Sequence, residues 1–210
     1  MWMYAKVNES HWRSASRVGR RLLCVACVAL YGCGHTSKPS PYAAQVQATR
    51  DSLQAQRLTQ EAAAVLKKDP ARAERLLLEA LGADLFRGPA HNNLGVVYLQ
   101  QGKLYEAAGE FEWARKLMPG SPEPRVNLAA TLERAGRTEE ALANYEAALE
   151  AAPGSIGAMQ GLTRLQVRAK RMDDRTPGML QEIAMRGETE HWRTWARMRL
   201  TAGEGASANR

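Results

Sequence analysis

The sequence predicts an all-α protein made of stacked helix-turn-helix units, and three observations predict this fold class. From residue 88 onward the chain repeats itself at a spacing of 34 residues. Within each repeat, small and apolar residues recur at the three- to four-residue interval of one helix face. No segment shows the alternation of apolar and polar side chains that is typical of a β-strand.

Matched residues at this spacing show how each repeat is built. Small residues match where two helices would pack closely, glycines where a left-handed turn would follow the first helix, and prolines where the second helix would end. The pairs are Leu94 with Leu128, Gly95 with Ala129, Tyr98 with Leu132, Gly102 with Gly136, Ala107 with Ala141, Phe111 with Tyr145, Ala114 with Ala148 and Pro119 with Pro153.

This period and this order of residues resemble the tetratricopeptide repeat (TPR), most strongly over 88–153. The resemblance implies that the repeats stack into a solenoid with a C-terminal helical cap. It also implies that the first helix of each repeat lines a concave groove, which accepts an extended peptide or a partner helix.

In chain order, TPR repeats are expected over 50–153, and the first of them, about 50–86, is degenerate. Its two helices are predicted over 50–67 and 70–82, the second after the cap and first-turn proline Asp69-Pro70. Glu61 occupies the small-residue position, and Lys68 occupies the position of the turn glycine.

Two full repeats are expected next, over 88–121 and 122–155. Ser121, Thr138 and Ser155 are expected to open helices, because hydroxyl side chains accept hydrogen bonds from the first backbone N–H groups.

Beyond these repeats the pattern departs from the family, and we expect capping helices over 155–202. Helices should begin at Thr176-Pro177 and near Thr189. Residues 203–210 are small and polar, so we expect a disordered tail.

Composition and charge exclude several classes of protein. A hydrophobic fraction of 45% excludes a wholly disordered chain, and a mean hydropathy of −0.43 excludes a polytopic membrane protein. The net charge is +7, but residues 1–50 hold seven Lys/Arg and one Asp/Glu, whereas 51–210 hold 22 and 21. A nucleic-acid-binding protein needs clustered cations on its folded body, so we expect no nucleic-acid partner.

Residues 1–32 have the pattern of a secretory signal peptide. Arginines precede an apolar run from Leu22 to Tyr31, and small residues follow it. A run of this length covers about 15 Å of helix, half of a hydrocarbon core, so we expect no stable transmembrane span. A translation start near Val18 would leave a shorter basic segment.

The exit sequence Leu30-Tyr31-Gly32-Cys33 resembles the bacterial lipoprotein box, although Tyr31 is bulkier than the usual residue there. The resemblance implies that Cys33 is lipidated and becomes the mature N-terminus, with a linker over 33–49. Several acyl chains on one residue would anchor the chain firmly.

The other cysteines, Cys24 and Cys27, form a CxxC pattern that can bind zinc or carry redox chemistry. Because both lie inside the apolar run, we interpret them as signal residues and expect no metal site.

No catalytic motif of a hydrolase, metalloprotease, phosphate loop or dinucleotide site occurs in the sequence. His91 stands where many TPRs have Trp, so we expect it to pack, and we expect His191 on a helix surface. We therefore expect no enzyme activity, no cofactor and no small-molecule substrate.

The resemblance places candidate partner-binding residues on the groove helices. Asn93 and Asn127 match an asparagine that can hydrogen-bond to a ligand backbone; equally, asparagine suits a wet position near a helix start. Val96 and Ala130 stand where a clamp for terminal carboxylates has cations or polar residues, so we expect an internal segment or an amphipathic helix. The groove set is Asn92, Asn93, Val96, Leu99, Val126, Asn127, Ala130 and Glu133.

Three tryptophans are candidates for packing or for contact with a partner. Trp113 replaces a residue that is usually charged and outward in the family, so it is a candidate exposed contact, or it covers a neighbouring helix. Trp192 and Trp195 lie three residues apart and are expected to pack at the end of the solenoid.

Charge is unevenly distributed along the folded region. Residues 101–150 hold six basic and nine acidic side chains, whereas 151–210 hold ten and six. The basic residues either form a solvated surface or contact an anionic lipid or acidic partner. They are Arg164, Arg168, Lys170, Arg171 and Arg175.

Together these patterns predict a TPR lipoprotein of the bacterial cell envelope that faces the periplasm or the exterior. It would hold another protein in its groove as an interaction scaffold or assembly factor. The alternatives are a soluble cytoplasmic TPR adaptor with a mis-called N-terminus and a pilus-assembly lipoprotein of the pilotin type.

Overall fold

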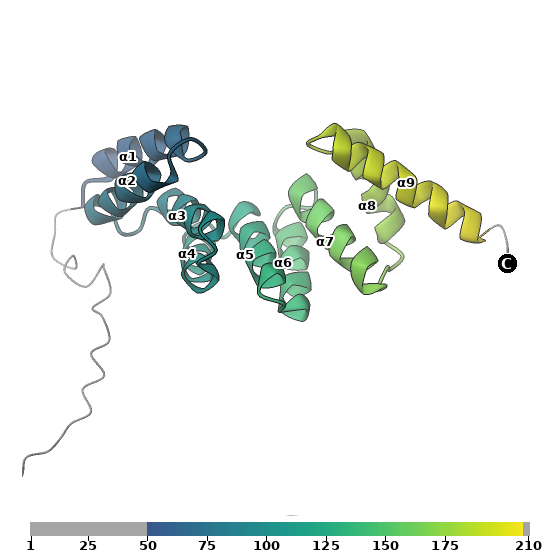
Figure 1. The fold of residues 1–210 in the computed structure, drawn as a ribbon. Coiled ribbons are helices and arrows are strands. Elements are labelled where there is room, and N and C mark those ends of the chain that lie inside the picture. Colours follow the sequence, from purple (N-terminus) through teal and green to yellow (C-terminus); the bar gives the residue numbers. More distant parts are fainter. Residues whose placement is uncertain (1–49, 208–210) are drawn as a thin grey trace, which may run out of the picture. The chain divides into compact units, whose positions relative to one another are not determined.

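The computed structural model describes residues 50–207, and these residues form nine helices and no strand, as predicted. Figure 1 shows the helices following one another in chain order. The predicted signal peptide, Cys33 and the linker to residue 49 lie outside the described residues. The helices are α1 (Ser52–Val65), α2 (Pro70–Ala83), α3 (Gly88–Gln100), α4 (Leu104–Leu117), α5 (Glu123–Arg134), α6 (Thr138–Ala151), α7 (Ile156–Ala169), α8 (Thr176–Arg186) and α9 (Glu190–Ser207).

The helices pack in consecutive pairs, as in TPR proteins. α1 packs on α2, α3 on α4, α5 on α6 and α8 on α9, and each pair contacts the next helix along the chain. In addition, α1 contacts α3, α3 contacts α5, and α5 contacts α7. The first helices of successive pairs therefore form one row, and α7 continues that row beyond the two full repeats.

Close packing of α3 on α4 depends on Gly95. A Cβ on Gly95 would lie 2.6 Å from Cε1 of Phe111, whose ring is fully buried. The turns after α3 and α5 also need glycine, because Gly102 and Gly136 have φ values of +75° and +77°. These roles confirm the expectations drawn from the repeat.

In the degenerate first repeat the packing register moves by one residue. Glu61, which the spacing predicts at the small-residue position, lies on the surface and accepts a hydrogen bond from Arg72 at 2.6 Å. The next residue, Ala62, is fully buried. α1 therefore keeps a small packing residue, one position later than the spacing predicts.

The helix caps agree with the sequence in part. Asp69 accepts a hydrogen bond from the backbone N–H of Arg72 at 2.9 Å, and Ser155 accepts one from that of Ala158 at 3.4 Å. The expectation for Ser121 is wrong, because its hydroxyl donates to the Glu123 carboxylate and α5 begins without a side-chain cap.

The last helix is longer than expected. α9 extends to Ser207, so the tail predicted from residue 203 begins with helical residues.

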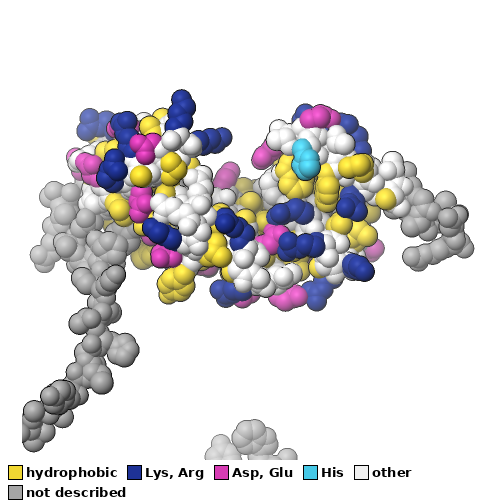
Figure 2. Space-filling view, in the orientation of Figure 1, with side chains coloured by type: hydrophobic (Ala, Val, Ile, Leu, Met, Phe, Trp, Pro, Cys, Tyr) yellow, Lys and Arg dark blue, Asp and Glu magenta, His cyan; other side chains and the backbone are white. Residues whose placement is uncertain are grey.

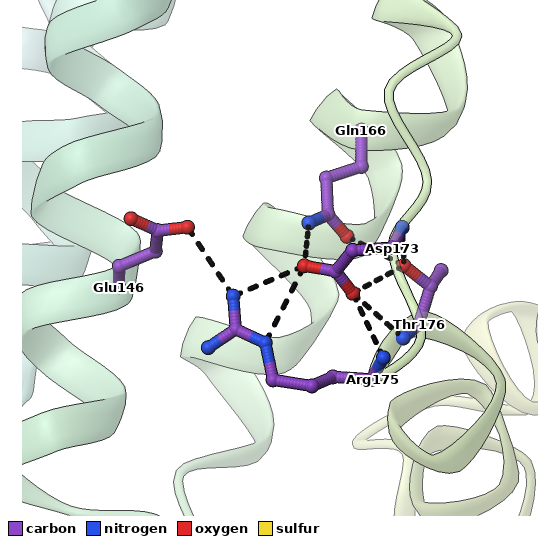
Figure 3. Close-up of polar contacts among 5 residues, drawn as sticks. All are labelled: Glu146, Gln166, Asp173, Arg175 and Thr176. Atoms are coloured by element: carbon purple, nitrogen blue, oxygen red, sulfur yellow. Dashed lines mark hydrogen bonds and ion pairs between the residues drawn. The ribbon is translucent and has the colours of Figure 1, made fainter.

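Asp173 organises the turn between α7 and α8 (Figure 3). Its Oδ1 accepts hydrogen bonds from the backbone N–H groups of Arg175 and Thr176, both at 3.0 Å. Its Oδ2 accepts from Gln166 Nε2 at 3.1 Å and from Arg175 Nη2 at 3.0 Å. Burial disfavours the carboxylate, but these hydrogen bonds outweigh burial and hold the pKa of Asp173 below its usual value.

We predict that Gly95→Ala destabilises the protein by about 1–3 kcal/mol, because its methyl group overpacks against Phe111. The matched control is Gly109→Ala on α4, where a Cβ meets no atom within 4 Å. This control should stabilise by about 0.5–1 kcal/mol, because alanine has the higher helix propensity. Urea unfolding midpoints measure both, and equal midpoints for the two variants would contradict the packing role.

We predict that Asp173→Ala costs about 1 kcal/mol, because α8 loses the acceptor for its first N–H groups. Asp173→Asn keeps an oxygen acceptor and should lose only the ionic part. Since the folded pKa lies below the usual value of 3.8, the carboxylate stabilises the fold above that pH. The advantage over Asp173→Asn should disappear as the pH falls through the folded pKa, as followed by thermal unfolding; an advantage that persists in acid contradicts the assignment.

Candidate functional site

The predicted groove residues lie on α3 and α5, two neighbouring helices of the row. Asn92, Asn93, Val96 and Leu99 lie on α3, and Val126, Asn127, Ala130 and Glu133 lie on α5. All eight are partly buried, and the side chain of Glu133 is deeply covered. The TPR pattern therefore places them on adjacent helices.

A cleft of about 790 Å³ lies beside these residues. Its lining comes from α3, α5, Tyr145 of α6, α7, the turn before α7 and the region where α9 begins. Asn92, Val126 and Asn127 line the cleft, whereas the remaining five members of the predicted set do not.

Asn127 has a partner inside the fold. Its Nδ2 donates a hydrogen bond to Oδ1 of Asn92 at 3.0 Å, which joins α5 to α3 at the cleft. This contact gives Asn127 a positioning role. Binding of a ligand backbone by Asn127 or Asn93 stays a prediction.

Glu133 of α5 is occupied by cations from α7. Its side chain is only 6% exposed, and it pairs with Arg164 at 2.7 Å and Arg168 at 2.9 Å. The Tyr145 hydroxyl donates to the same carboxylate at 3.5 Å. Burial and then the charge of Glu133 raise the pKa of Tyr145 to about 12, so this hydroxyl keeps its proton.

The contribution of α7 to the cleft was not predicted, because its residues were expected in the cap. Gly157, Gln160, Gly161 and Arg164 all line the cleft. The repeat spacing of 34 residues connects Val126 to Gln160, so extending that spacing by one more repeat would have found these positions.

Tyr145 on α6 packs against α7 at Gly161. A Cβ on Gly161 would lie 2.1 Å from Cε1 of Tyr145, so the ring occupies the space of a missing side chain. Glycine at this position lets the aromatic ring fix α7 against the preceding repeat.

Gln160 is a buried polar residue at the wall of the cleft. It is 4% exposed, and nothing among residues 50–207 accepts a hydrogen bond from its Nε2. An unpaired buried donor costs about 1–3 kcal/mol.

His91 and Trp113 form a separate cluster on α3 and α4. His91 is fully buried, with Nε2 2.8 Å from the Leu85 carbonyl oxygen and Nδ1 2.7 Å from a Glu110 oxygen, so its predicted packing role is confirmed. Trp113 stacks on His91 with ring centroids 5.6 Å apart and is 43% exposed. It does not line the cleft.

Trp192 and Trp195 lie on α9 and contact each other. Their rings meet edge to face with centroids 5.5 Å apart, and both pack against the core beneath α9, as expected for a cap. Trp192 also lines the cleft, which the sequence did not predict.

The basic residues of α7 and the turn after it are paired with acids of the preceding repeat. Arg171 pairs with Glu139, and Arg175 pairs with Glu146 at 3.4 Å as well as with Asp173. With Arg164 and Arg168 on Glu133, four of the five predicted cations face carboxylates. Figure 2 shows basic and acidic side chains interspersed on the face it draws. These ion pairs favour the interpretation of the basic residues as a solvated surface over contact with an anionic lipid or an acidic partner.

Within the described residues there is no cluster of His, Cys, Asp and Glu that could hold a metal ion. None of the helices described is both long and apolar enough to cross a membrane.

The family model for the protein kinase G tetratricopeptide repeat matches residues 38–204. Comparison with curated proteins finds no match.

Solved TPR structures have a similar fold. The first TPR of Spaghetti (RPAP3) bound to the HSP90 peptide SRMEEVD has a TM-score of 0.54 and 20% identity, covering 58% of this chain and 97% of that chain. The second TPR domain of human RPAP3 in complex with the HSP70 peptide SGPTIEEVD has a TM-score of 0.51 and 21% identity, covering 54% and 96%. The Sgt2 TPR domain from Aspergillus fumigatus has a TM-score of 0.54 and 21% identity, covering 59% and 85%. At these identities the likeness shows the fold alone.

Proposed function

We propose that this chain, which belongs to the protein kinase G tetratricopeptide repeat family, holds a segment of a partner protein in the cleft beside α3, α5 and α7. Its role would be that of an interaction scaffold or assembly factor, without a reaction of its own. The observation that carries this proposal is the open cleft on the first-helix row.

The lining of the cleft suits a peptide. Val126, Ile156 and Trp192 offer apolar contact, while Asn92 and Gln160 offer amide groups that can bond to a peptide backbone. The TPR domains of RPAP3 supply a parallel, because their structures hold peptides of HSP90 and HSP70. This parallel supports the class of ligand.

We also propose that the chain is lipidated at Cys33 and held in the bacterial cell envelope. The support is the sequence Leu30-Tyr31-Gly32-Cys33 after a basic and an apolar segment. A cytoplasmic TPR adaptor is the alternative, and pilotin-like pilus assembly would be one specific form of the envelope role.

Gly157 offers a sharp test of the cleft. A Cβ at this position would lie 3.9 Å from Glu188 Oε1 and from Val126 Cγ1, which is ordinary contact. Gly157→Ala should therefore fold and bind normally, whereas the larger side chain of Gly157→Leu should extend into the cleft and block a peptide.

We predict that crosslinking followed by quantitative mass spectrometry recovers the same partner with wild type and with Gly157→Ala. Gly157→Leu should reduce recovery by about tenfold or more, which corresponds to the loss of about 1.4 kcal/mol of binding. Circular dichroism and thermal midpoints check that both variants are folded. Undiminished capture by a folded Gly157→Leu protein would exclude the cleft as the binding site.

We predict that cells fed radioactive fatty acid label the wild-type chain and the Cys27→Ala control but not Cys33→Ala. The physical reason is that the lipid is attached through the Cys33 thiol. A wild-type chain without label, or label that survives in Cys33→Ala, contradicts the anchoring proposal.

A further inference from the structure

The C-terminal cap supplies one part of the cleft wall. Trp192 near the start of α9 and Glu188 in the turn before it both line the cleft, together with residues of the repeats and of α7. A cap is required only to cover the last apolar surface of a solenoid. A partly exposed tryptophan at the cleft therefore goes beyond the capping role.

The two tryptophans of α9 differ in what covers them. Trp195 packs against the core, has the guanidinium carbon of Arg199 5.9 Å from its ring centroid, and does not line the cleft. Trp192 packs against the core and edge to face against Trp195, and it also lines the cleft. Trp195 therefore has a packing role, whereas Trp192 is available to a ligand.

The turn before α9 holds Trp192 in place. A Cβ on Gly187 would lie 2.6 Å from the Ile183 carbonyl oxygen and 3.2 Å from Cβ of Trp192, so this close turn needs glycine. Arg193 donates a hydrogen bond from Nη1 to the Gly187 carbonyl oxygen at 2.7 Å. Ala196, one helical turn beyond Trp192, is fully buried. The indole ring is thus positioned before a ligand arrives, which lowers the entropy lost on binding.

Gly157 leaves room in the cleft for a side chain of the ligand. A Cβ at this position would have no neighbour nearer than 3.9 Å, and its neighbours are Val126 Cγ1 of α5 and Glu188 Oε1 of the turn before α9. Ile156 and Trp192 line the same cleft. Glu188 is exposed, so its carboxylate can stay in water at the rim. The space above Gly157 therefore suits an apolar side chain.

We infer that a large apolar side chain of the bound segment lies above Gly157, in contact with Val126 and Trp192, and that Trp192 determines which segments bind. This inference rests on the proposed function and names the part of the ligand that is recognised. Well-packed aromatic residues carry much of the binding free energy of an interface. The bound segment would bridge α5 and the cap.

The test begins with random peptides displayed on phage and selected on the purified full-length chain. Peptides that also bind Gly157→Leu are removed, so that only ligands of the cleft are kept. We expect Leu, Ile, Met or Phe to be enriched at one position of the selected peptides.

The tryptophans of α9 supply a variant and its matched control. Trp192→Ala should weaken a selected peptide about tenfold or more, as expected for a central aromatic contact. Trp192→Phe keeps an aromatic ring and should bind within about threefold of wild type. Trp195→Ala should lower the thermal midpoint and yet bind within about threefold while folded, because Trp195 lies outside the cleft.

A double-mutant cycle separates contact with the ligand from support of the cap. Replacing the enriched apolar residue of the peptide by alanine should cost about tenfold with wild type but about twofold or less with Trp192→Ala. A tryptophan that only stabilised the cap would leave the two losses independent. Should Trp192→Ala not fold, Trp192→Leu takes its place in the cycle.

The outcomes distinguish the inference from the proposed function. Selected peptides without an enriched apolar position, full affinity in the Trp192 variant, or independent losses in the cycle overturn the inference and leave the proposed function standing. A selection that yields no ligand sensitive to Gly157→Leu overturns both.

Discussion

At two places in this chain, an aromatic ring packs onto a glycine and lets two helices approach closely. Phe111 packs onto Gly95 within a repeat, and Tyr145 packs onto Gly161 between a repeat and the next helix. A single hairpin of this length cannot bury its own apolar face, so these contacts and the stacking that they allow create the core. The second contact also sets the place of α7, and with it the side of the cleft that carries Gln160 and Gly157. The binding site therefore depends on the same packing that stabilises the fold.

The ion pairs between repeats depend on the same stacking of helices. Three acids of residues 101–150 pair with bases of 151–210. Glu133 pairs with arginines of α7, and Glu139 and Glu146 pair with Arg171 and Arg175 in the turn to α8. Each exposed pair contributes little to stability, but Glu133 is nearly buried and holds two arginines. One nearly buried carboxylate of α5 therefore holds two cations of α7.

Much of the fold could be predicted from the sequence, because the repeat is defined by residues that act within one helical hairpin. Gly102 allows the positive φ of a turn, Gly95 allows two helices to pack closely, and the prolines end helices. These roles can be recognised in the sequence without knowledge of the tertiary contacts. The residues of the cleft were harder to predict. Glu133 was expected in the groove, but its side chain is taken by two arginines of α7, and such pairing between distant residues leaves no mark on a single sequence. Gln160 follows the repeat spacing but was missed because the sequence beyond residue 155 departs from the family pattern and was assigned to the cap.

The central claim is that a ligand lies on the row of first helices and touches α7. Amide NMR spectra of isotope-labelled protein, recorded during titration with a peptide from the crosslinked partner, measure this directly. The account predicts shifts for the backbone amides of Gly157 and Gly161 and for the indole N–H of Trp192, all of which line the cleft. The indole N–H of Trp113, outside the cleft, should stay in place. Shifts confined to Trp113 and its neighbours on α4, with the α7 glycines unmoved, would contradict it.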